Sequence, residues 1–271
     1  MEFKAELLPP KINLETTSII RRIVAANRYL AELKGKALTI PNENILISTL
    51  TLQEAKDSSA VENIITTHDE LYKAQLFEKY ITSASTKEVS RYAEALKTGF
   101  FMVRKKRLIT TETILTLQKI LENNDAGFRK LPGTKLINET TGETIYTPPQ
   151  DYGTITKLID NFVDFINDDS ISQLDPLIKM SMLHYQFETI HPFYDGNGRT
   201  GRILNILYLV IKNLLDLPIL YLSRYIINNK NDYYRLLQGV RDNNNWEEWI
   251  EYNLRGIEET AKETIILINQ F

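Results

Sequence analysis

The stretch TIHPFYDGNGRTGR, residues 189–202, separates two apolar segments and concentrates polar and charged residue types in one short loop. A histidine and an aspartate precede closely spaced glycines, and arginines follow at positions 199 and 202. A simple turn needs only one glycine, because one residue with a positive φ is enough to reverse the chain. The additional glycines and the arginines therefore indicate that this loop holds an anion beside a site of chemistry.

The composition is that of an ordinary globular protein and excludes several classes of function. Hydrophobic residues make up 43% and charged residues 25% of the 271 residues. A net charge of −3 gives no global basic field for nucleic acid or an anionic membrane. The absence of cysteine excludes disulfides and thiol chemistry.

No segment of the sequence has the pattern of a targeting signal or a membrane span. The N-terminal residues MEFKAELLPP lack the apolar core of a signal peptide. The longest apolar region, residues 203–222, is interrupted by Lys212, Asp216 and Pro218, which favours a buried helix and a turn. We therefore expect a cytoplasmic protein that contacts neither nucleic acid nor a membrane.

Apolar residues recur at helical spacing along most of the chain. The pattern predicts helices over residues 13–35, 42–56, 85–106, 110–123, 154–168, 175–190, 199–215, 231–240 and 245–265. Capping signals suggest Asn13 as the N-cap and Gly35 as the end of the first helix. They also suggest a capping box from Ser85 to Glu88, and Asp175 as the N-cap of the helix before the motif.

Residues 123–151 depart from the helical pattern because they are rich in glycine and proline. Within them, KLINETTGETIYTPP has two short β-prone runs around a polar turn that contains Gly142. This pattern predicts a β-hairpin over residues 134–148. The hairpin is either a plain surface feature or a projection that grips a peptide by strand addition. The predicted fold class is all-α, a helical bundle with one projecting hairpin.

The motif supplies an anion site if a helix begins near Gly198. The backbone amides of Gly196, Asn197 and Gly198 would then have no partners within the helix. The helix dipole adds about half a positive charge at that end. Arg199 and Arg202 lie on one face of the same helix end, and their forked donors suit phosphate oxygens.

His191 and Asp195 supply the remaining parts of a reaction site. An imidazole has an unperturbed pKa of about 6.5, so His191 can act as a neutral base at neutral pH. Asp195 would repel a bare phosphate, but such a carboxylate can hold Mg²⁺ between phosphate oxygens. These parts indicate phosphoryl or nucleotidyl transfer. The alternative is an ordinary corner between two helices, with the arginines on a solvated face.

The string HPFYDGNGR followed by TGR resembles the signature of the Fic family, H-x-F-x-[D/E]-G-N-G-R-x-x-R, with every fixed position filled. Residues 220–252 are similar to the segment after that motif in many Fic proteins, and AELLPP and SSAVENI resemble the accompanying N-terminal region. The resemblance covers most of the chain and implies a Fic-type bundle. It implies an N-terminal helical region at residues 1–105 and a catalytic domain at residues 106–271.

The resemblance implies transfer of AMP from ATP to a tyrosine, threonine or serine hydroxyl of a target protein, with Mg²⁺ or Mn²⁺ as cofactor. His191 would take the proton from that hydroxyl, Asp195 would bind the metal ion, and Phe193 would be a buried anchor. Arg202 would hold the γ-phosphate. The other implied ATP-binding residues are Gly196, Asn197, Gly198, Arg199, Thr200, Gly201, Tyr233 and Tyr234.

Two of these implications keep an alternative. Tyr233 and Tyr234 would contact the nucleoside, although either could be a core aromatic of its helix. The hairpin would be a flap that aligns the target backbone, with Thr144, Ile145 and Tyr146 on the strand that faces the site.

The stretch SSAVENI, residues 58–64, has two interpretations. Ser59 and Glu62 match a capping box, which would begin a helix. Ser58, Glu62 and Asn63 also match the pattern [S/T]-x-x-x-E-[G/N] of the Fic inhibitory helix. In that family the glutamate reaches the second motif arginine, here Arg202, and keeps the γ-phosphate from its productive position. We favour the inhibitory interpretation because a complete motif follows.

The sequence leaves other functions open beside an autoinhibited adenylyltransferase. Within the same fold, the enzyme could remove AMP or transfer another nucleotide or a phosphoryl group. Doc-like kinases have a lysine where this chain has Gly198, which argues against that branch. A non-catalytic nucleotide-sensing module would need neither His191 nor Asp195. The target protein is not identified by the sequence, and a homodimer remains open.

Overall fold

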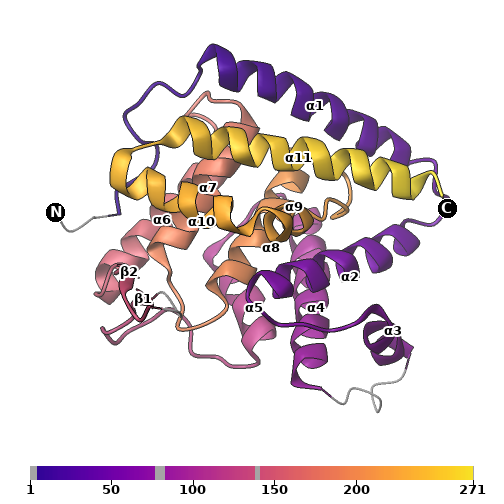
Figure 1. Ribbon diagram of the computed structural model, residues 1–271, viewed down its shortest axis with the longest axis horizontal. Helices are drawn as coiled ribbons and strands as arrows, with labels where there is room; N and C mark the ends of the chain where they lie inside the picture. Colours follow the sequence, from indigo (N-terminus) through magenta and orange to yellow (C-terminus); the bar gives the residue numbers. More distant parts are fainter. Residues whose placement is uncertain (1–4, 77–82, 138–140, 271) are drawn as a thin grey trace.

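The computed structural model describes residues 5–76, 83–137 and 141–270, which form a helical bundle with one small hairpin (Figure 1). The predicted fold class is confirmed in this part of the chain. The elements in chain order are α1 (Thr17–Ala37), α2 (Glu43–Val61), α3 (His68–Leu76), α4 (Ala84–Lys106), α5 (Thr111–Glu122), β1 (Leu136–Ile137), β2 (Thr144–Tyr146), α6 (Tyr152–Asn167), α7 (Pro176–Ile190), α8 (Asn197–Ile211), α9 (Ser223–Asn228), α10 (Lys230–Asn243) and α11 (Trp246–Ile268).

The first helix begins and ends later than the sequence predicts. Thr16 is the N-cap of α1 and accepts a hydrogen bond from the backbone of Ile19, whereas Asn13 accepts one from Glu15 in the turn before the helix. Gly35 lies inside α1, which continues to Ala37. Ala37 is buried in the core, so tertiary packing extends the helix past the glycine.

The capping box predicted at Ser85 is wrong, because Ser83 is the N-cap of α4 and accepts from the Thr86 amide at 3.0 Å. The side chain of Glu88 instead reaches Arg199 on another helix. The predicted N-cap at Asp175 is confirmed, since its carboxylate accepts from the Leu177 amide at 2.8 Å and Pro176 is the first helical residue.

Two short helices, α3 and α9, are not predicted by the periodicity. The N-cap residue of α9, Leu222, makes no side-chain cap bond, and a side chain from α2 binds the first turn of α9 instead. The buried Glu54 of α2 accepts hydrogen bonds from the Ser223 amide at 3.0 Å and from the Ser223 hydroxyl. One turn further along α2, Asp57 pairs with Arg224 at 2.8 Å. A long-range contact therefore stabilises a helix that is too short to show an apolar stripe.

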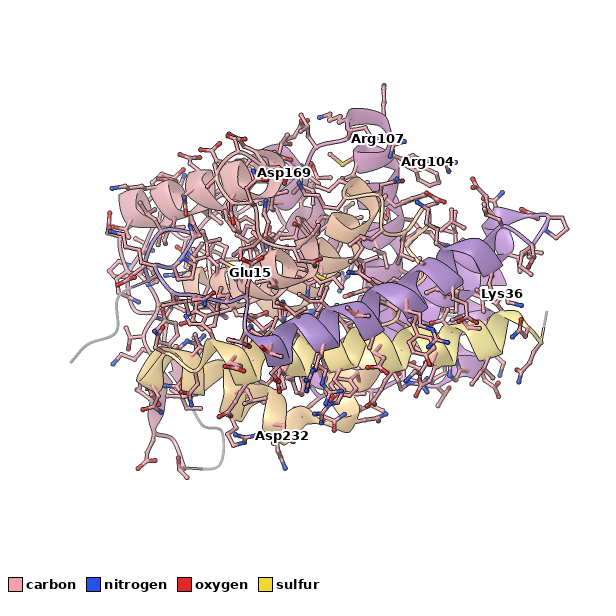
Figure 2. All side chains as sticks on the ribbon, turned by 90° about the horizontal axis from the view of Figure 1, so that it is seen from above. Glu15, Lys36, Arg104, Arg107, Asp169 and Asp232 are labelled. Atoms are coloured by element: carbon pink, nitrogen blue, oxygen red, sulfur yellow. The ribbon has the colours of Figure 1, made fainter. Side chains whose placement is uncertain are left out.

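Helices α1 and α11 lie side by side as an outer layer over the rest of the bundle (Figures 1 and 2). In Figure 2, Glu15 marks the chain just before α1 and Lys36 marks its other end, with α11 alongside. Thr16 donates a hydrogen bond to Glu247 at 3.0 Å, and Ser18 donates one to Glu251. These contacts join the first helix to the last.

Helices α7 and α8 form the centre of the molecule. Every residue of α7 from Leu177 to Ile190 is buried, as is most of α8. A helix that is covered on all sides belongs to the core, and here α2, α4 and α5 pack against α8 while α6 packs against α7. The loop between α7 and α8 is therefore carried by the two most enclosed helices.

The long apolar region at residues 203–222 is divided between α8, which ends at Ile211, and the turn that follows it, in agreement with the sequence prediction. Among the residues that the structure describes, no helix combines the length and the apolar character needed to cross a membrane.

The predicted hairpin is present as the antiparallel pair β1 and β2. Leu136 pairs with Tyr146 and Ile137 with Thr144, with an irregularity in register between them. Part of the predicted turn, residues 138–140, lies outside the described residues. The hairpin projects from the bundle near the end of α7 (Figure 1).

Candidate active site

The loop between α7 and α8 is short and braced from within. His191 is the C-cap of α7 with φ 47°, and Gly196 is the N-cap of α8 with φ 77°. The Asn197 side chain accepts from the Phe193 amide at 2.8 Å and donates to the Phe193 carbonyl at 2.9 Å. The Phe193 ring is fully buried beside Phe128, as expected of an anchor. These contacts hold the loop in place. The loop spans residues 191–196, and its limits lie within one residue of the predicted ones.

The N-cap of α8 is Gly196, which has no side chain to cap the first turn, and the amide of Gly196 itself donates to Asp195 at 2.7 Å. The first intrahelical bond runs from the Thr200 amide to the Gly196 carbonyl at 2.9 Å, which leaves the amides of residues 197–199 without acceptors in the helix. A Cβ atom on Gly198 would lie 2.5 Å from Oε1 of Glu62. The Glu62 carboxylate therefore stands directly beside the helix end that the sequence predicts to be an anion site.

Thr200 and Gly201 lie on the inner side of α8. Thr200 is fully buried, and a Cβ on Gly201 would lie 3.1 Å from Oε1 of Glu188 and 3.2 Å from Cδ1 of Phe187. Gly201 therefore faces α7 and Thr200 is enclosed, so their predicted contribution to an ATP site would come through packing.

Arg199 is buried among carboxylates from four segments of the chain. Its Nε lies 2.8 Å from Glu62, its Nη1 3.2 Å from Glu88, and its Nη2 2.9 Å from Glu122 and 3.8 Å from Asp195. Its side chain is only 3% exposed, so these partners occupy the guanidinium on all sides. The predicted phosphate contact of Arg199 would require it to give up one of these carboxylates.

Arg202 is equally buried but has fewer partners. Its Nη2 donates to Glu62 Oε1 at 2.7 Å and to the Ser58 carbonyl at 3.1 Å, and its Nε donates to the Ser58 hydroxyl at 2.7 Å. The structure thus brings Arg202 to Ser58 and Glu62, which precede it by 144 and 140 residues. Of these two partners, only Glu62 is charged.

Glu62 lies at the end of a helix, which makes the capping-box interpretation wrong. Helix α2 ends at Val61, Glu62 is its C-cap, and Ser59 lies inside the last turn. Asn63 has φ 63° and reverses the chain, as Asn can at a helix end. Its side chain accepts a hydrogen bond from Lys230 at 3.1 Å. The serine and the glutamate of this pattern therefore lie at the end of a helix, and the glutamate carboxylate pairs with the distant Arg202.

His191 is held in a setting that keeps its imidazole neutral. Burial is the main cause that lowers the pKa of His191, to about 3, and the nearby charges of Arg129 and Arg241 lower it further. Its Nδ1 has no well-formed hydrogen bond among the described residues, although the Glu188 carbonyl is near enough to favour the protonated form slightly. A neutral imidazole at pH 7 can accept a proton.

Asp195 is the exposed carboxylate of the loop, with 76% of its side chain accessible. It accepts a hydrogen bond from the Gly196 amide at 2.7 Å, and burial raises the pKa of the neighbouring Glu122, with Asp195 among the further causes. No group of three or more metal-ligating side chains is found in residues 5–76, 83–137 and 141–270. Asp195 is an exposed carboxylate of the kind that Mg²⁺ uses together with phosphate oxygens and water.

The three predicted flap residues differ in exposure. Thr144 and Ile145 are exposed, whereas Tyr146 is buried. The Tyr146 hydroxyl donates to the Thr189 carbonyl at 2.8 Å, and the Arg241 guanidinium carbon lies 4.0 Å from the centre of its ring. One residue of β2 therefore attaches the hairpin to α7 and α10, and two residues remain on the surface.

Tyr233 and Tyr234 are placed differently, although they are adjacent on α10. Tyr233 is buried, and its hydroxyl lies 2.9 Å from Nε2 of His184. Tyr234 is about half exposed and packs edge-on against Tyr233. The core-aromatic alternative suits Tyr233, and Tyr234 is the one with a surface to offer a nucleoside.

The sequence reasoning missed three residues of the site: Glu88, Glu122 and Arg129. Glu88 and Glu122 pair with Arg199, which is 111 and 77 residues further along the chain. The buried Arg129 donates to the His191 carbonyl at 2.7 Å across 62 residues. Glu88 belongs to the pattern of a capping box, which indicates a different role, and Glu122 and Arg129 belong to no local pattern, so only the fold reveals the roles of all three.

Family models match two parts of the chain. Residues 20–101 match the Fic/DOC family N-terminal model, and residues 108–209 match the Fic/DOC family model. The second match contains the whole loop between α7 and α8.

Curated relatives carry the name protein adenylyltransferase. A protein of Aquifex aeolicus named as a probable protein adenylyltransferase is 29% identical over 181 residues, which cover 65% of this chain and 53% of that protein. The protein adenylyltransferase of Caenorhabditis briggsae is 41% identical over 59 residues, which cover 22% of this chain and 11% of that protein. The chain thus spans about half the length of these relatives or less.

Solved structures share the fold. A Fic family protein from Desulfovibrio desulfuricans superposes with a TM-score of 0.78 at 20% identity, covering 97% of this chain and 78% of that one. Residues 134–508 of a Fic-1 protein from C. elegans superpose with a TM-score of 0.69 at 18% identity, covering 93% of this chain and 73% of that one. At these identities the likeness concerns the fold alone.

Proposed function

Because the chain belongs to the Fic/DOC family, we propose that it is a protein adenylyltransferase whose activity is restrained by its own Glu62. In this reaction a hydroxyl oxygen of a target protein attacks the α-phosphorus of ATP. The bond between the α-phosphorus and the oxygen that leads to the β-phosphorus breaks, and pyrophosphate leaves. The curated relatives' names support this transfer.

His191 is the group that would take the proton of the attacking hydroxyl. Its imidazole is neutral, because burial lowers its pKa to about 3, and it stands at the end of α7 beside the open end of α8. General base catalysis is typically worth about 10² to 10⁴ in rate. The proton passes to His191 as the new phosphorus–oxygen bond forms.

The phosphates of ATP would lie at the open N-terminus of α8. Its uncapped amides and the helix dipole favour an anion there, and glycine at positions 196 and 198 lets phosphate oxygens approach the backbone. Arg202 stands one turn into the helix and supplies a forked pair of donors for the γ-phosphate. These groups bind and orient ATP so that its α-phosphorus faces the attacking oxygen.

Asp195 would hold a divalent cation, Mg²⁺ or Mn²⁺, on the exposed side of the loop. When bound, the ion supplies positive charge that neutralises the phosphate oxygens. Asp195→Asn should raise the metal concentration needed for half-maximal activity and leave the thermal melt unchanged. Full activity of the wild-type protein in excess chelator would remove the ion from the proposal.

The observation that carries the proposed restraint is the contact of Glu62 with both motif arginines. Its Oε1 lies 2.7 Å from Arg202 and its Oε2 lies 2.8 Å from Arg199. A γ-phosphate at Arg202 would compete with this carboxylate for the same guanidinium and would be repelled by it. Glu62 thus removes one positive charge from the phosphate site and adds a negative one.

The exposed strand of the hairpin would receive the target protein. Thr144 and Ile145 face solvent, while Tyr146 secures the strand to α7. Backbone groups of a short, exposed strand can pair with an extended target segment. The same arrangement would present a serine, threonine or tyrosine hydroxyl to His191.

Two radiolabels and one premodified substrate test the reaction class. The Glu62→Gly protein is incubated with candidate target proteins and ATP labelled at either the α- or the γ-phosphate. Labelling of the target protein from α-labelled ATP alone supports AMP transfer. Labelling of the target protein from γ-labelled ATP would instead indicate phosphoryl transfer. Loss of AMP from an adenylylated target without ATP would assign the reverse activity, and binding of ATP without any labelled product would leave a nucleotide-sensing module.

A further inference from the structure

The last carbonyl groups of α7 and its C-cap are all bonded by residues of the segment that carries the hairpin. The Thr189 carbonyl accepts from the Tyr146 hydroxyl at 2.8 Å. The Ile190 and His191 carbonyls accept from Arg129 Nη2 at 3.4 Å and Nε at 2.7 Å. The Pro192 carbonyl accepts from the backbone amide of Arg129 at 2.8 Å. Four consecutive carbonyls around His191 are therefore held from outside their own helix.

These bonds satisfy carbonyl groups that lack hydrogen-bond partners at the C-terminus of a helix. The last four carbonyls of an α-helix have no intrahelical partners, and a cation at that end is also favoured by the helix dipole. Arg129 provides both the donors and the charge at the end of α7. His191 has φ 47°, a left-handed conformation that is costly for a residue other than glycine, so its geometry persists only when its neighbours enforce it.

Arg129 also holds the other end of the hairpin segment. Its Nη2 donates to the Pro149 carbonyl at 2.8 Å, just after β2 and before α6. The same guanidinium thus bonds to the loop that carries the proposed catalytic base and to the root of the hairpin. Within the described residues no carboxylate lies at ion-pair distance from Arg129, so its guanidinium donates to neutral carbonyl groups, and its Nη1 has no hydrogen-bond partner there.

We propose that Arg129 is a positioning residue, which fixes the backbone of His191 in its left-handed geometry and couples the target-aligning hairpin to it. This inference rests on the proposed function of His191 as the base. A substrate segment that docks on the hairpin is then aligned to the imidazole through one guanidinium. Arg199 and Arg202 have a different proposed role, because they lie in the first turns of α8 beside the proposed phosphate site.

The charge of Arg129 acts on His191 as well. The groups that act on the imidazole are the guanidinium groups of Arg129 and of Arg241 from α10, and the backbone carbonyl of Glu188 from α7. Arg129 is the larger of the two charged contributions that lower the pKa of His191, after burial. Removal of the guanidinium should therefore let His191 take up a proton at a higher pH.

Two substitutions separate position from charge. Arg129→Gln removes both the fork and the charge, whereas Arg129→Lys keeps the charge and loses the fork. In the full chain carrying Glu62→Gly, we expect each to lower kcat for target labelling by about tenfold to a hundredfold, because small displacements of a base have effects of this size. The KM for ATP should stay within a few-fold. Arg104→Gln, which removes a surface charge far from the site, is the matched control.

Nuclear magnetic resonance provides a readout that does not depend on activity. The chain has three histidines, and a His191→Ala spectrum assigns the His191 ring. From about pH 8 to pH 5, where an ordinary imidazole titrates, the ring should stay neutral in the parent protein and begin to protonate in Arg129→Gln. Arg129→Lys should remain close to the parent. The buried His184, whose pKa is lowered to about 3 by burial and by Arg202, is an internal control.

Specific outcomes overturn the inference. A parent-like kcat in a folded Arg129→Gln protein rejects the inference. A fall in the kcat of Arg129→Gln without any change in its His191 titration also rejects it, since that reflects general weakening. If Arg129→Gln does not fold, an unchanged kcat in Arg129→Lys rejects it instead. Failure of the Glu62→Gly parent to transfer any label from ATP would end the proposed function, while the titration would still decide whether Arg129 controls His191.

Discussion

The two helix ends that meet at residues 191–196 are built in opposite ways. The C-terminus of α7 is closed, because Tyr146 and Arg129 bond every carbonyl from Thr189 to Pro192. The N-terminus of α8 is open beyond the Gly196 amide, which donates to Asp195, because its N-cap glycine has no side chain to cap the first turn. Chemistry that needs a fixed base and an exchangeable anion requires this difference. A helix end is completed by the protein where a group must not move and left incomplete where a ligand must enter.

The largest expected effect comes from removal of the base at the closed end. His191→Ala in the Glu62→Gly background should lower labelling by about 10² to 10⁴, since general base catalysis is worth that much. ATP affinity, measured by calorimetry, should stay within a few-fold because the open end of α8 is untouched. Undiminished labelling by this variant would show that the closed end does not carry the base.

The open end should respond to Glu62→Gly in the opposite direction. Loss of the carboxylate frees Arg202 for the γ-phosphate, a charge-assisted contact about twice as strong as a neutral hydrogen bond, and aligns the α-phosphorus. We expect labelling to rise by about tenfold or more. Rates of the two proteins with the same target provide the measurement.

The matched control for this change is Glu88→Gln compared with Glu62→Gln. Both remove one carboxylate from Arg199, and only Glu62 also contacts Arg202. Activation by Glu62→Gln alone supports competition at Arg202. Equal activation by both variants would indicate that the restraint acts through Arg199 and not through Arg202.

The closed end should also make folding sensitive to acid. Burial lowers the pKa of His191 to about 3, so the folded state resists a proton that the unfolded chain accepts below about pH 6.5. The stabilisation is complete above the unfolded pKa and is lost as the pH falls towards 3. Glu188, whose pKa burial raises to about 7, changes stability in the opposite sense between the unfolded carboxyl pKa and 7.

A comparison with His191→Ala isolates the histidine from these other groups. Between pH 7 and pH 5, urea unfolding of the parent should lose about 1 to 2 kcal/mol more than that of His191→Ala, following the linkage relation. If the unfolding free energies of the two proteins depended on pH in the same way, the lowered pKa of His191 in the folded state would be contradicted.

The smallest expected effect concerns one bond at the closed end. Tyr146→Phe removes the hydrogen bond to Thr189 but keeps the ring under Arg241. The unfolding free energy should fall by about 0.5 to 1.5 kcal/mol, the usual net value of such a bond. Target KM should rise several-fold and ATP affinity should not change. A rise in the KM for ATP without a rise in the KM for the target would contradict the proposed role of the hairpin in target alignment.

The sequence predicts the parts of this site that depend on local pattern. The limits of the motif loop, the Asp175 cap and the hairpin all follow from residues that are neighbours in the chain, and the structure confirms them. The assignments of catalytic, metal and nucleotide roles stay predictions, as does the division at residue 105.

The capping box predicted at Ser85 and the alternative capping box at Ser59 show where local pattern fails. Ser59–Glu62 and Ser85–Glu88 both have the spacing of a box, yet both glutamates reach the guanidinium of Arg199. A buried guanidinium attracts a carboxylate more strongly than a backbone amide at a solvated helix end does. Arg129 and Glu122 could not be found from the sequence for a related reason, since their partners are set only by the packing of distant segments.

The attachment of α2 to α9 and to the first residue of α10 has a consequence for the proposed competition at the phosphate site. The contacts Glu54–Ser223, Asp57–Arg224 and Asn63–Lys230 hold the end of α2. Under the proposed restraint, Glu62 would be a tethered competitor whose effective concentration at Arg202 is about millimolar or above. Free ATP would then displace it only poorly by mass action. Loosening any of these three contacts would dilute the competitor without changing the residues proposed to bind or react, so the proposed activity would be adjustable from α9 and α10.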